Sequence, residues 1–303
     1  GGTNLQNDGA IGADAIASGK DASAQGARSI AVGLGAQARA QPNGIPNVPG
    51  LSADNSVAIG SSAVAGNSNA VALGQSAQAN RSGSIAIGSG AQTRWDGSLQ
   101  SNQFASQIAI GAGAYTGTGA GTGAMALGSG ASADGGNIQT AIGSGATVRG
   151  NITTAVGAQA TANGDTVAAV GVRAQASGFD SVAFGTLATS GRNAAGASVS
   201  SASAIGVYSA AQGTGASAIG TGAFVFGNGS GSVAAINPNV ARIQGAAKND
   251  TVFSIVGGSE NFAVGNRNLV GGTSSNNVAF GNDIKLGASA ATFEERTVVQ
   301  NGV

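Results

Sequence analysis

The stretch Asn55-Ser56-Val57-Ala58-Ile59-Gly60 is one copy of a short unit that recurs through much of the chain. Val57 and Ile59 alternate with Ala58, so the two large side chains share one face of an extended strand and Ala58 lies on the other. The final glycine suits a tight corner, because glycine adopts positive φ without steric cost. The stretch therefore indicates a short β-strand that ends at a turn.

The same tetrapeptide, a small or β-branched residue followed by Ala, a large apolar residue and Gly, returns at a constant interval. Steps of 14 residues separate the final glycines at Gly60, Gly74 and Gly88, then at Gly143, Gly157, Gly171 and Gly185, and then at Gly206 and Gly220. A half-period of seven residues separates Gly12, Gly19, Gly26 and Gly33. Each unit thus predicts two short strands and two turns. A helix is disfavoured, because each interior glycine costs up to about 1 kcal/mol relative to Ala.

A single unit of this size is too small to fold alone. The entropy lost in ordering its backbone exceeds what two or three buried Val or Ile side chains return. Hydrogen bonds between stacked coils and apolar contacts with neighbours must supply the rest, which predicts a parallel β-solenoid. Both faces of each strand are apolar or Ala. One face fills the coil and the other requires a partner chain, so we expect an oligomer.

Composition excludes several other classes of protein. With 54 glycines in 303 residues, 4% aromatic and 9% charged residues, the chain lacks the material of an ordinary globular core. Collagen would need glycine at every third position and abundant proline, but only four prolines are present. A formal net charge of zero offers no attraction for nucleic acid or anionic lipid. Cys and His are absent, which removes disulfides, thiol chemistry and the commonest general base.

No catalytic, cofactor-binding or metal-binding residues are expected. Gly19-Lys20-Asp21 lacks the Ser or Thr that completes a phosphate-binding loop. The Asp residues do not follow the Gly-Gly-x-Gly-x-Asp register of calcium-binding β-rolls. The 13 acidic residues are dispersed, which denies the paired carboxylates of a polysaccharide hydrolase. We therefore predict that the protein is not an enzyme and carries no cofactor.

The pattern Ser-Val-Ala-Ile-Gly followed by Ala-x-Ala-x-Gly-x-x-Ser resembles the head repeat of trimeric autotransporter adhesins of the Yersinia-adhesin type. Residues 55–69, 83–91, 140–185 and 202–220 carry the pattern. The resemblance implies an all-β fold, a left-handed parallel β-roll of roughly 14-residue coils assembled as a homotrimer. Both the handedness and the number of chains come from the resemblance alone.

The same resemblance implies a location and a function. Heads of this type are displayed on the bacterial cell surface, where they serve virulence by attaching to extracellular matrix proteins, host cells or abiotic surfaces. A C-terminal region that is not present here would anchor the protein in the outer membrane. We therefore expect a non-catalytic adhesin head, with no nucleic-acid partner.

Breaks in the repeat divide the chain. Pro42, Pro46 and Pro49 cannot donate hydrogen bonds to a sheet and mark an excursion from the coil. The step from Gly185 to Gly206 is 21 residues, half a coil longer than the standard. In chain order, the expected parts are head repeats at 1–227 with loop insertions at 34–55, 89–107 and 112–124, an insertion containing a β-hairpin at 228–261, final head repeats at 262–287, and a transition toward a neck or stalk at 288–303.

Arg94, Trp95, Phe104 and Tyr115 are the candidate adhesive residues. All four lie where the repeat is broken, and loops carry binding residues more often than regular elements do. Trp, Tyr and Arg are also enriched in binding hot spots. The alternative is that these aromatic residues cover the end of a coil or pack between chains.

Two other functions stay open. A structural spacer would hold a separate binding tip away from the cell. An ice-binding solenoid would need Thr at one fixed position in successive coils. The first position of the tetrapeptide instead holds Val, Ile, Thr, Ala and Ser in different copies, which disfavours ice binding.

Overall fold

The computed structural model describes most of the chain as β-strands and turns, with no helix among the described residues. Two compact units, residues 1–152 and 153–303, are the first and second unit below. The described residues are 8–39, 52–94, 106–117, 123–192 and 197–226, with the short segments 231, 233–235, 255–256, 260, 262–266, 269–271, 276, 278–282 and 285–287.

In the first unit the described strands form two parallel sheets, the odd sheet and the even sheet, named after the numbers of their strands. The odd sheet contains β1 (Ile16–Ser18), β3 (Ile30–Val32), β5 (Val57–Ile59), β7 (Val71–Leu73), β9 (Ile85–Ile87), β11 (Ile108–Ile110), β13 (Met125–Leu127) and β15 (Gln139–Ile142). The even sheet contains β2 (Ser23–Ala24), β4 (Gln37–Ala38), β6 (Val64–Ala65), β8 (Gln78–Ala79), β10 (Gln92–Thr93), β12 (Tyr115–Thr116), β14 (Ser132–Asp134) and β16 (Thr147–Arg149).

The second unit repeats this plan with its own strands of the odd and even sheets. Its odd strands are β17 (Thr153–Val156), β19 (Ala168–Val170), β21 (Val182–Phe184), β23 (Ser203–Ile205), β25 (Ser217–Ile219), β27 (Val233–Ala235), β29 (Phe262–Asn266) and β31 (Val278–Asn282). Its even strands are β18 (Thr161–Asn163), β20 (Gln175–Ser177), β22 (Thr189–Ser190), β24 (Ala210–Ala211), β26 (Phe224–Phe226), β28 (Ile255–Val256), β30 (Leu269–Gly271) and β32 (Lys285–Gly287).

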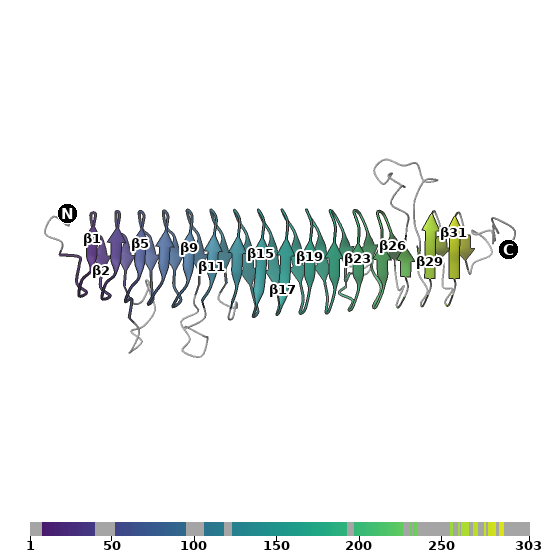
Figure 1. The fold of residues 1–303 in the computed structure, drawn as a ribbon, viewed down its shortest axis with the longest axis horizontal. Coiled ribbons are helices and arrows are strands. Elements are labelled where there is room, and N and C mark those ends of the chain that lie inside the picture. Colours follow the sequence, from purple (N-terminus) through teal and green to yellow (C-terminus); the bar gives the residue numbers. More distant parts are fainter. Residues whose placement is uncertain are drawn as a thin grey trace. The chain divides into compact units, whose positions relative to one another are not determined.

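Each strand pairs in register with the strand one coil away, so like residues stack on like. Ala58 of β5 pairs with Ala72 of β7, which pairs with Ala86 of β9. Figure 1 shows the strands of each unit following one another in chain order. Neighbouring coils are therefore about 4.7–4.9 Å apart, the spacing of paired strands. The prediction of an all-β parallel solenoid with coils of about 14 residues is confirmed.

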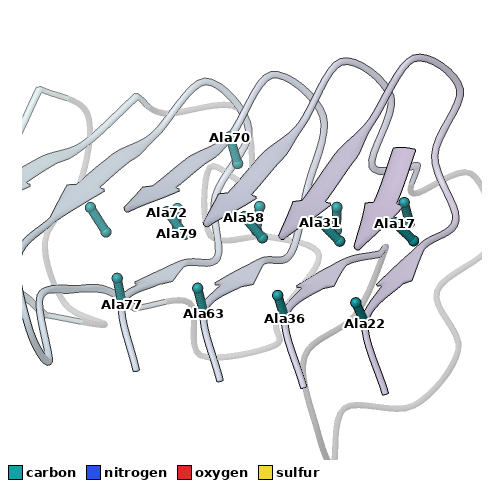
Figure 2. Packing of buried hydrophobic residues seen from close by; sticks show 14 of the residues in the cluster. Ala17, Ala22, Ala31, Ala36, Ala58, Ala63, Ala70, Ala72, Ala77 and Ala79 are labelled. Atoms are coloured by element: carbon teal, nitrogen blue, oxygen red, sulfur yellow. The ribbon is translucent and has the colours of Figure 1, made fainter. Parts of the chain in front are cut away.

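Alanine fills the interior of the coils. The middle residue of each odd strand points inward, and Ala31, Ala58 and Ala72 have no exposed surface. Opposite them, Ala36 and Ala63 precede the even strands and are equally buried. Figure 2 shows the two rows of methyl groups lining the inside of the first unit. A coil this thin leaves room for little more than a methyl group from each side, which explains why Ala recurs at these positions.

Some coils of the first unit have a polar interior. Thr116 Oγ1 donates a hydrogen bond to Gln107 Oε1 over 2.7 Å, and both side chains are fully buried. Gln139 lies inside the coil after a turn one residue longer than usual, and its Nε2 donates to the carbonyls of Asp134 and Gly150 at 3.0 and 2.9 Å. The side chain of Gln139 is long enough to donate to these two carbonyl groups, which the longer turn would otherwise leave unpaired.

The glycine that ends each odd strand is required by close contact between coils. Gly74 has φ of 132°, a conformation that other residues rarely adopt. A Cβ atom at Gly74 would lie 2.7 Å from the carbonyl carbon and oxygen of Gly88 in the next coil. The 14-residue recurrence of glycine thus marks the position where neighbouring backbones meet most closely.

Several predicted interruptions contain regular coil. Strand β4 falls inside the insertion expected at 34–55, β10 inside 89–107, and β12 inside 112–124. The even strands are often two residues long and lack the Val-Ala-Ile pattern, which is why these parts were assigned to loops. Of the three insertions, the structure describes residues 34–39, 52–55, 89–94, 106–107, 112–117 and 123–124. Their other residues lie outside the described part of the chain.

The β-hairpin expected within 228–261 is wrong. Its two strands, β27 and β28, belong to different sheets: β27 pairs in parallel with β25, and β28 pairs in parallel with β26. They form another coil, because parallel pairing with neighbouring coils satisfies both edges of each strand. Strands β29 to β32 continue the solenoid over the final repeats, whereas residues 288–303 lie outside the described residues.

The half-coil excess between Gly185 and Gly206 falls between β22 and β23, and residues 193–196 within it lie outside the described residues. Arg192 forms an antiparallel bridge with Ser198, and the amide of Val199 donates to the carbonyl of Gly191 over 2.9 Å. Beyond this excursion β23 pairs with β21 in the standard register. The solenoid therefore tolerates an added segment at a turn without a change in coil pairing.

Candidate adhesive surface

The outer face of the odd sheet is apolar. In the first unit, Ile59 and Leu73 stand next to each other on this face, with 37% and 40% of their surface exposed. In the second unit, Phe184, Ile205 and Ile219 form a comparable row with 55%, 42% and 44% exposed. The alternation of the strand sends Ala inward and these side chains outward. A continuous apolar face of this kind marks an interaction surface.

The outer face of the even sheet is mostly polar. In the first unit its row runs through Gln78, Gln92, Tyr115, Ser132 and Thr147, each paired with the next. All five are half-buried, because each side chain lies against those of the neighbouring coils. Tyr115 is the only aromatic residue among the described residues of this unit. It therefore stands out within a row of amides and hydroxyl groups.

Two of the four predicted adhesive residues are described, and they lie on neighbouring coils. Tyr115 occupies the outer face of β12 and is half-buried, whereas Arg94 directly follows β10 and is exposed. The amide of Arg94 donates to the carbonyl of Thr116 over 3.0 Å, which joins the two coils at this point. The guanidinium Nε of buried Arg81 donates to the carbonyl of Arg94 over 2.9 Å. Arg94 is thus held by backbone contacts while its side chain faces solvent.

Trp95 and Phe104 lie outside the described residues. Two charged residues on the neighbouring coils do not stand out in the sequence. Asp134 and Arg149, at the ends of β14 and β16, pair directly in register. A Cβ atom at Gly117, two residues beyond Tyr115, would collide with the carboxylate of Asp134. Arg94, Tyr115, Asp134 and Arg149 form the group called the Arg94 surface below.

Large residues at one turn position were also missed. The second residue after the strand-ending glycine has positive φ, and in the first unit it is small at Ser62, Ser76 and Gly90. In the second unit the same position holds Arg173 and Tyr208. The difference between the two units at this position can be found in the sequence by aligning the coils on their strand-ending glycines.

The first row of the odd sheet does not form the threonine array that ice binding requires. Val57 pairs with Val71, which pairs with Ile85, and Thr140 pairs with Met125. Within the described coils this row is therefore apolar or mixed, and it gives no support to the ice-binding alternative.

The described residues offer no group for metal chemistry. Nowhere among them do three or more Asp, Glu, His or Cys residues gather closely enough to hold a metal ion. The same residues include no helix long and apolar enough to cross a membrane.

Comparison with known proteins identifies the repeat. The family model of the YadA head domain repeat matches residues 10–36, 52–75, 65–91, 153–174 and 168–188. Over these residues the chain carries YadA head domain repeats. The repeats support an adhesin-type head domain of a trimeric autotransporter, and YadA-like heads are found on the bacterial cell surface. Among curated proteins no match to the chain is found.

Each matched segment of the YadA head repeat coincides with regular coils. The match at 52–75 covers β5, β6 and β7, and the match at 168–188 covers β19, β20 and β21. The family is generally non-enzymatic. The Arg94 surface and its strands β10, β12, β14 and β16 all lie outside the matched segments, so its role does not follow from the family.

Proposed function

We propose that this YadA-type head attaches a bacterium to extracellular matrix proteins, host cells or abiotic surfaces, acting without catalysis as a homotrimer. The observation that supports this proposal most directly is the apolar outer face of the odd sheet, set against the polar even sheet. One face is suited to packing chains together, and the other is suited to solvent and to a target. A C-terminal membrane anchor beyond this sequence is part of the proposal.

The odd sheet supports assembly through its rows of exposed Val, Ile and Leu. Residues such as Ile59 and Leu73 recur in register on successive coils, so one chain presents a long apolar stripe. Fully burying each such side chain is worth roughly 1.5–3 kcal/mol. Three chains that place their stripes around a common axis bury all of them and leave no unpaired apolar face, as a closed cyclic assembly requires.

Solution mass tests this assembly. We expect three times the chain mass of 28.5 kDa for the unaltered protein and loss of that species in the double variant Ile59→Glu with Leu73→Glu. Gln78→Glu with Gln92→Glu, which places the same two charges on neighbouring coils of the even sheet, is the matched control and should leave the mass unchanged. A folded, stable 28.5 kDa species of the unaltered chain would contradict the proposed trimer.

The Arg94 surface is the proposed contact with the target in the first unit. Arg94 is exposed and Tyr115 is half-buried on the neighbouring coil, and both residue types are enriched in binding hot spots. Trp95 and Phe104 are part of the same proposal on sequence grounds. Three identical copies of one weak site on a trimer raise the overall affinity through avidity.

A binding assay tests this contact. It measures attachment of the whole protein to immobilised matrix proteins, cultured cells and glass. The variant Arg94→Ala with Tyr115→Ser should lose most of its attachment and keep its mass and unfolding temperature, since Ser132 occupies the position of Tyr115 one coil away. Gln37→Ser, in the same row and with Ser23 as its neighbour, is the control. Attachment that is unchanged in the first variant supports a spacer that carries a separate binding tip.

A further inference from the structure

We propose a second contact surface, formed by Arg173, Leu187 and Tyr208 on one turn of three successive coils, which binds an amphipathic helix of a partner protein through an acidic residue and two apolar residues. The proposal rests on the attachment function proposed above and names the kind of partner segment involved. These three residues are called the turn row below.

The turn row stands out because its backbone conformation does not suit its side chains. Arg173, Leu187 and Tyr208 have φ values of 54°, 57° and 57°. Large residues rarely adopt this left-handed conformation, and Leu and Tyr gain nothing locally from it. In the first unit the same position holds Gly90, which accepts the conformation readily, and Ser76, whose side chain is small. Strain retained at displayed side chains is a reason to look for binding there.

Hydrogen bonds hold the turn row in register. The amides of Arg173, Leu187 and Tyr208 each donate to a carbonyl of the preceding coil, in every case over 2.9 Å. The backbone at these positions is therefore fixed, and a partner would meet side chains presented from a rigid ladder. Preorganisation of this kind lowers the entropy lost on binding.

The side chains of the turn row combine one cation with apolar surface. Arg173 is exposed, and Leu187 and Tyr208 are half-buried. The flanking residues Val172 and Val207 are 48% and 39% exposed, which widens the apolar part. Arg, Tyr and large apolar side chains together are typical of binding hot spots.

The guanidinium group of Arg173 favours an acidic partner. Its Nε donates to Gln159 Oε1 over 2.9 Å, and within the described part of the chain no carboxylate forms an ion pair with it. Arginine binds a carboxylate through two parallel hydrogen bonds, which gives both strength and direction. An acidic residue at one end of the partner segment is therefore the complement of this row.

The spacing of the row distinguishes a helix from a strand. Successive coils are about 4.7–4.9 Å apart, so Arg173 and Tyr208 are roughly 9.4–9.8 Å apart along the stack. A helix that lies along the row presents side chains i, i+3 or i+4, and i+7 on one face, at intervals of about 4.5–6 Å and a total of about 10.5 Å. A strand presents same-face side chains about 6.6 Å apart, so its side chains do not match coils that are about 4.7–4.9 Å apart. The row therefore matches a helix.

Three labelled peptides of about 20 residues, Ala-rich and long enough to be helical, test the proposal by fluorescence anisotropy with the full chain. The first carries Glu, Leu and Leu at i, i+4 and i+7. The second replaces that Glu with Lys, and the third places the same residues at i, i+2 and i+4. We expect the first peptide to bind roughly tenfold or more tightly than the other two.

The variant Arg173→Gln with Leu187→Ser and Tyr208→Gly should weaken binding of the first peptide by roughly tenfold or more. Each replacement occurs at the same turn position in another coil, at Gln159, Ser62 and Gly90, so the coil conformation is kept. Asp21→Ser, at the equivalent position of the first unit, is the control and should bind like the unaltered chain.

Three binding results would overturn the proposal: no binding of the first peptide, equal binding by the triple variant, or equal binding of all three peptides. A change in solution mass of the triple variant would also overturn it, because the row would then lie between copies of this chain. Unchanged attachment of the triple variant to cells and matrix proteins, together with lost peptide binding, confirms the helix site but shows that the attachment function depends on another surface.

Discussion

Replacing Gly74 with Ala should destabilise the solenoid far more than the same change at Gly90. At Gly74 the backbone has φ of 132°, and a non-glycine residue there costs about 1–3 kcal/mol. The added Cβ lies 2.7 Å from the carbonyl of Gly88, so the two coils must separate locally. Two inter-coil hydrogen bonds, from the amides of Gly88 and Gly90 to the carbonyls of Leu73 and Gln75, are weakened at about 1 kcal/mol each. The expected loss is about 3–5 kcal/mol.

Gly90→Ala isolates the conformational part of this effect. Its φ is 66°, and nothing lies within 4 Å of an added Cβ. The left-handed conformation costs Ala about 1–2 kcal/mol, partly offset by a gain of about 0.4–1 kcal/mol from the stiffer unfolded chain. The net loss should be about 0–1.6 kcal/mol.

Guanidinium unfolding followed by circular dichroism, at one fixed protein concentration, compares the two variants with the unaltered chain. The gain from the stiffer unfolded chain is the same in both variants, so the free energy of unfolding of Gly74→Ala should lie about 1–4 kcal/mol below that of Gly90→Ala. Equal free energies of unfolding for the two variants would show that neighbouring coils do not meet at Gly74 as described.

Three further substitutions test the interior and the turns. Thr116→Val removes the hydrogen bond that Thr116 Oγ1 donates to buried Gln107 Oε1 and should lower the free energy of unfolding by about 0.5–1.5 kcal/mol. Thr147→Val on the outer face should change it little, and thermal unfolding of both variants measures the difference. Ala72→Leu forces a larger side chain into a filled interior and should cost about 1–3 kcal/mol or more in chemical unfolding; an unchanged midpoint would refute the packing described. Ile138→Gly removes a β-branched residue from φ of 54°, so the unfolding temperature should stay the same or rise, and a clear fall would count against strain at this turn.

The odd strands could be predicted from the sequence because their signal is local and strong. Val57, Ala58 and Ile59 alternate, and the glycine that follows recurs every 14 residues. The even strands are weaker signals. Tyr115-Thr116 is two residues long, and its inward Thr bonds to Gln107 across the coil, a contact that no local pattern indicates. Tyr115 was consequently assigned to a loop rather than to the outer face of a sheet.

Non-local pairing explains the other error. Strands β27 and β28 look like the arms of a hairpin because they are close in sequence, yet each pairs with a strand from the preceding coil. The candidate site was predicted only in part. Arg94 could be predicted from its residue type and from its place in a break of the repeat. Asp134 and Arg149 could not, because their position beside it depends on the register of the even strands.

The alanine interior has a mechanical consequence. Ala has no side-chain torsion to reorganise, so the inside of a coil filled by alanine alone has a single arrangement and cannot relax by changing rotamers. Hydrogen bonds such as that from the amide of Gly88 to the carbonyl of Leu73 run along the direction in which the coils stack. Tension in that direction passes from coil to coil in series, and the weakest junction yields first while its neighbours stay folded. A surface protein pulled by flowing liquid would thus yield one coil at a time.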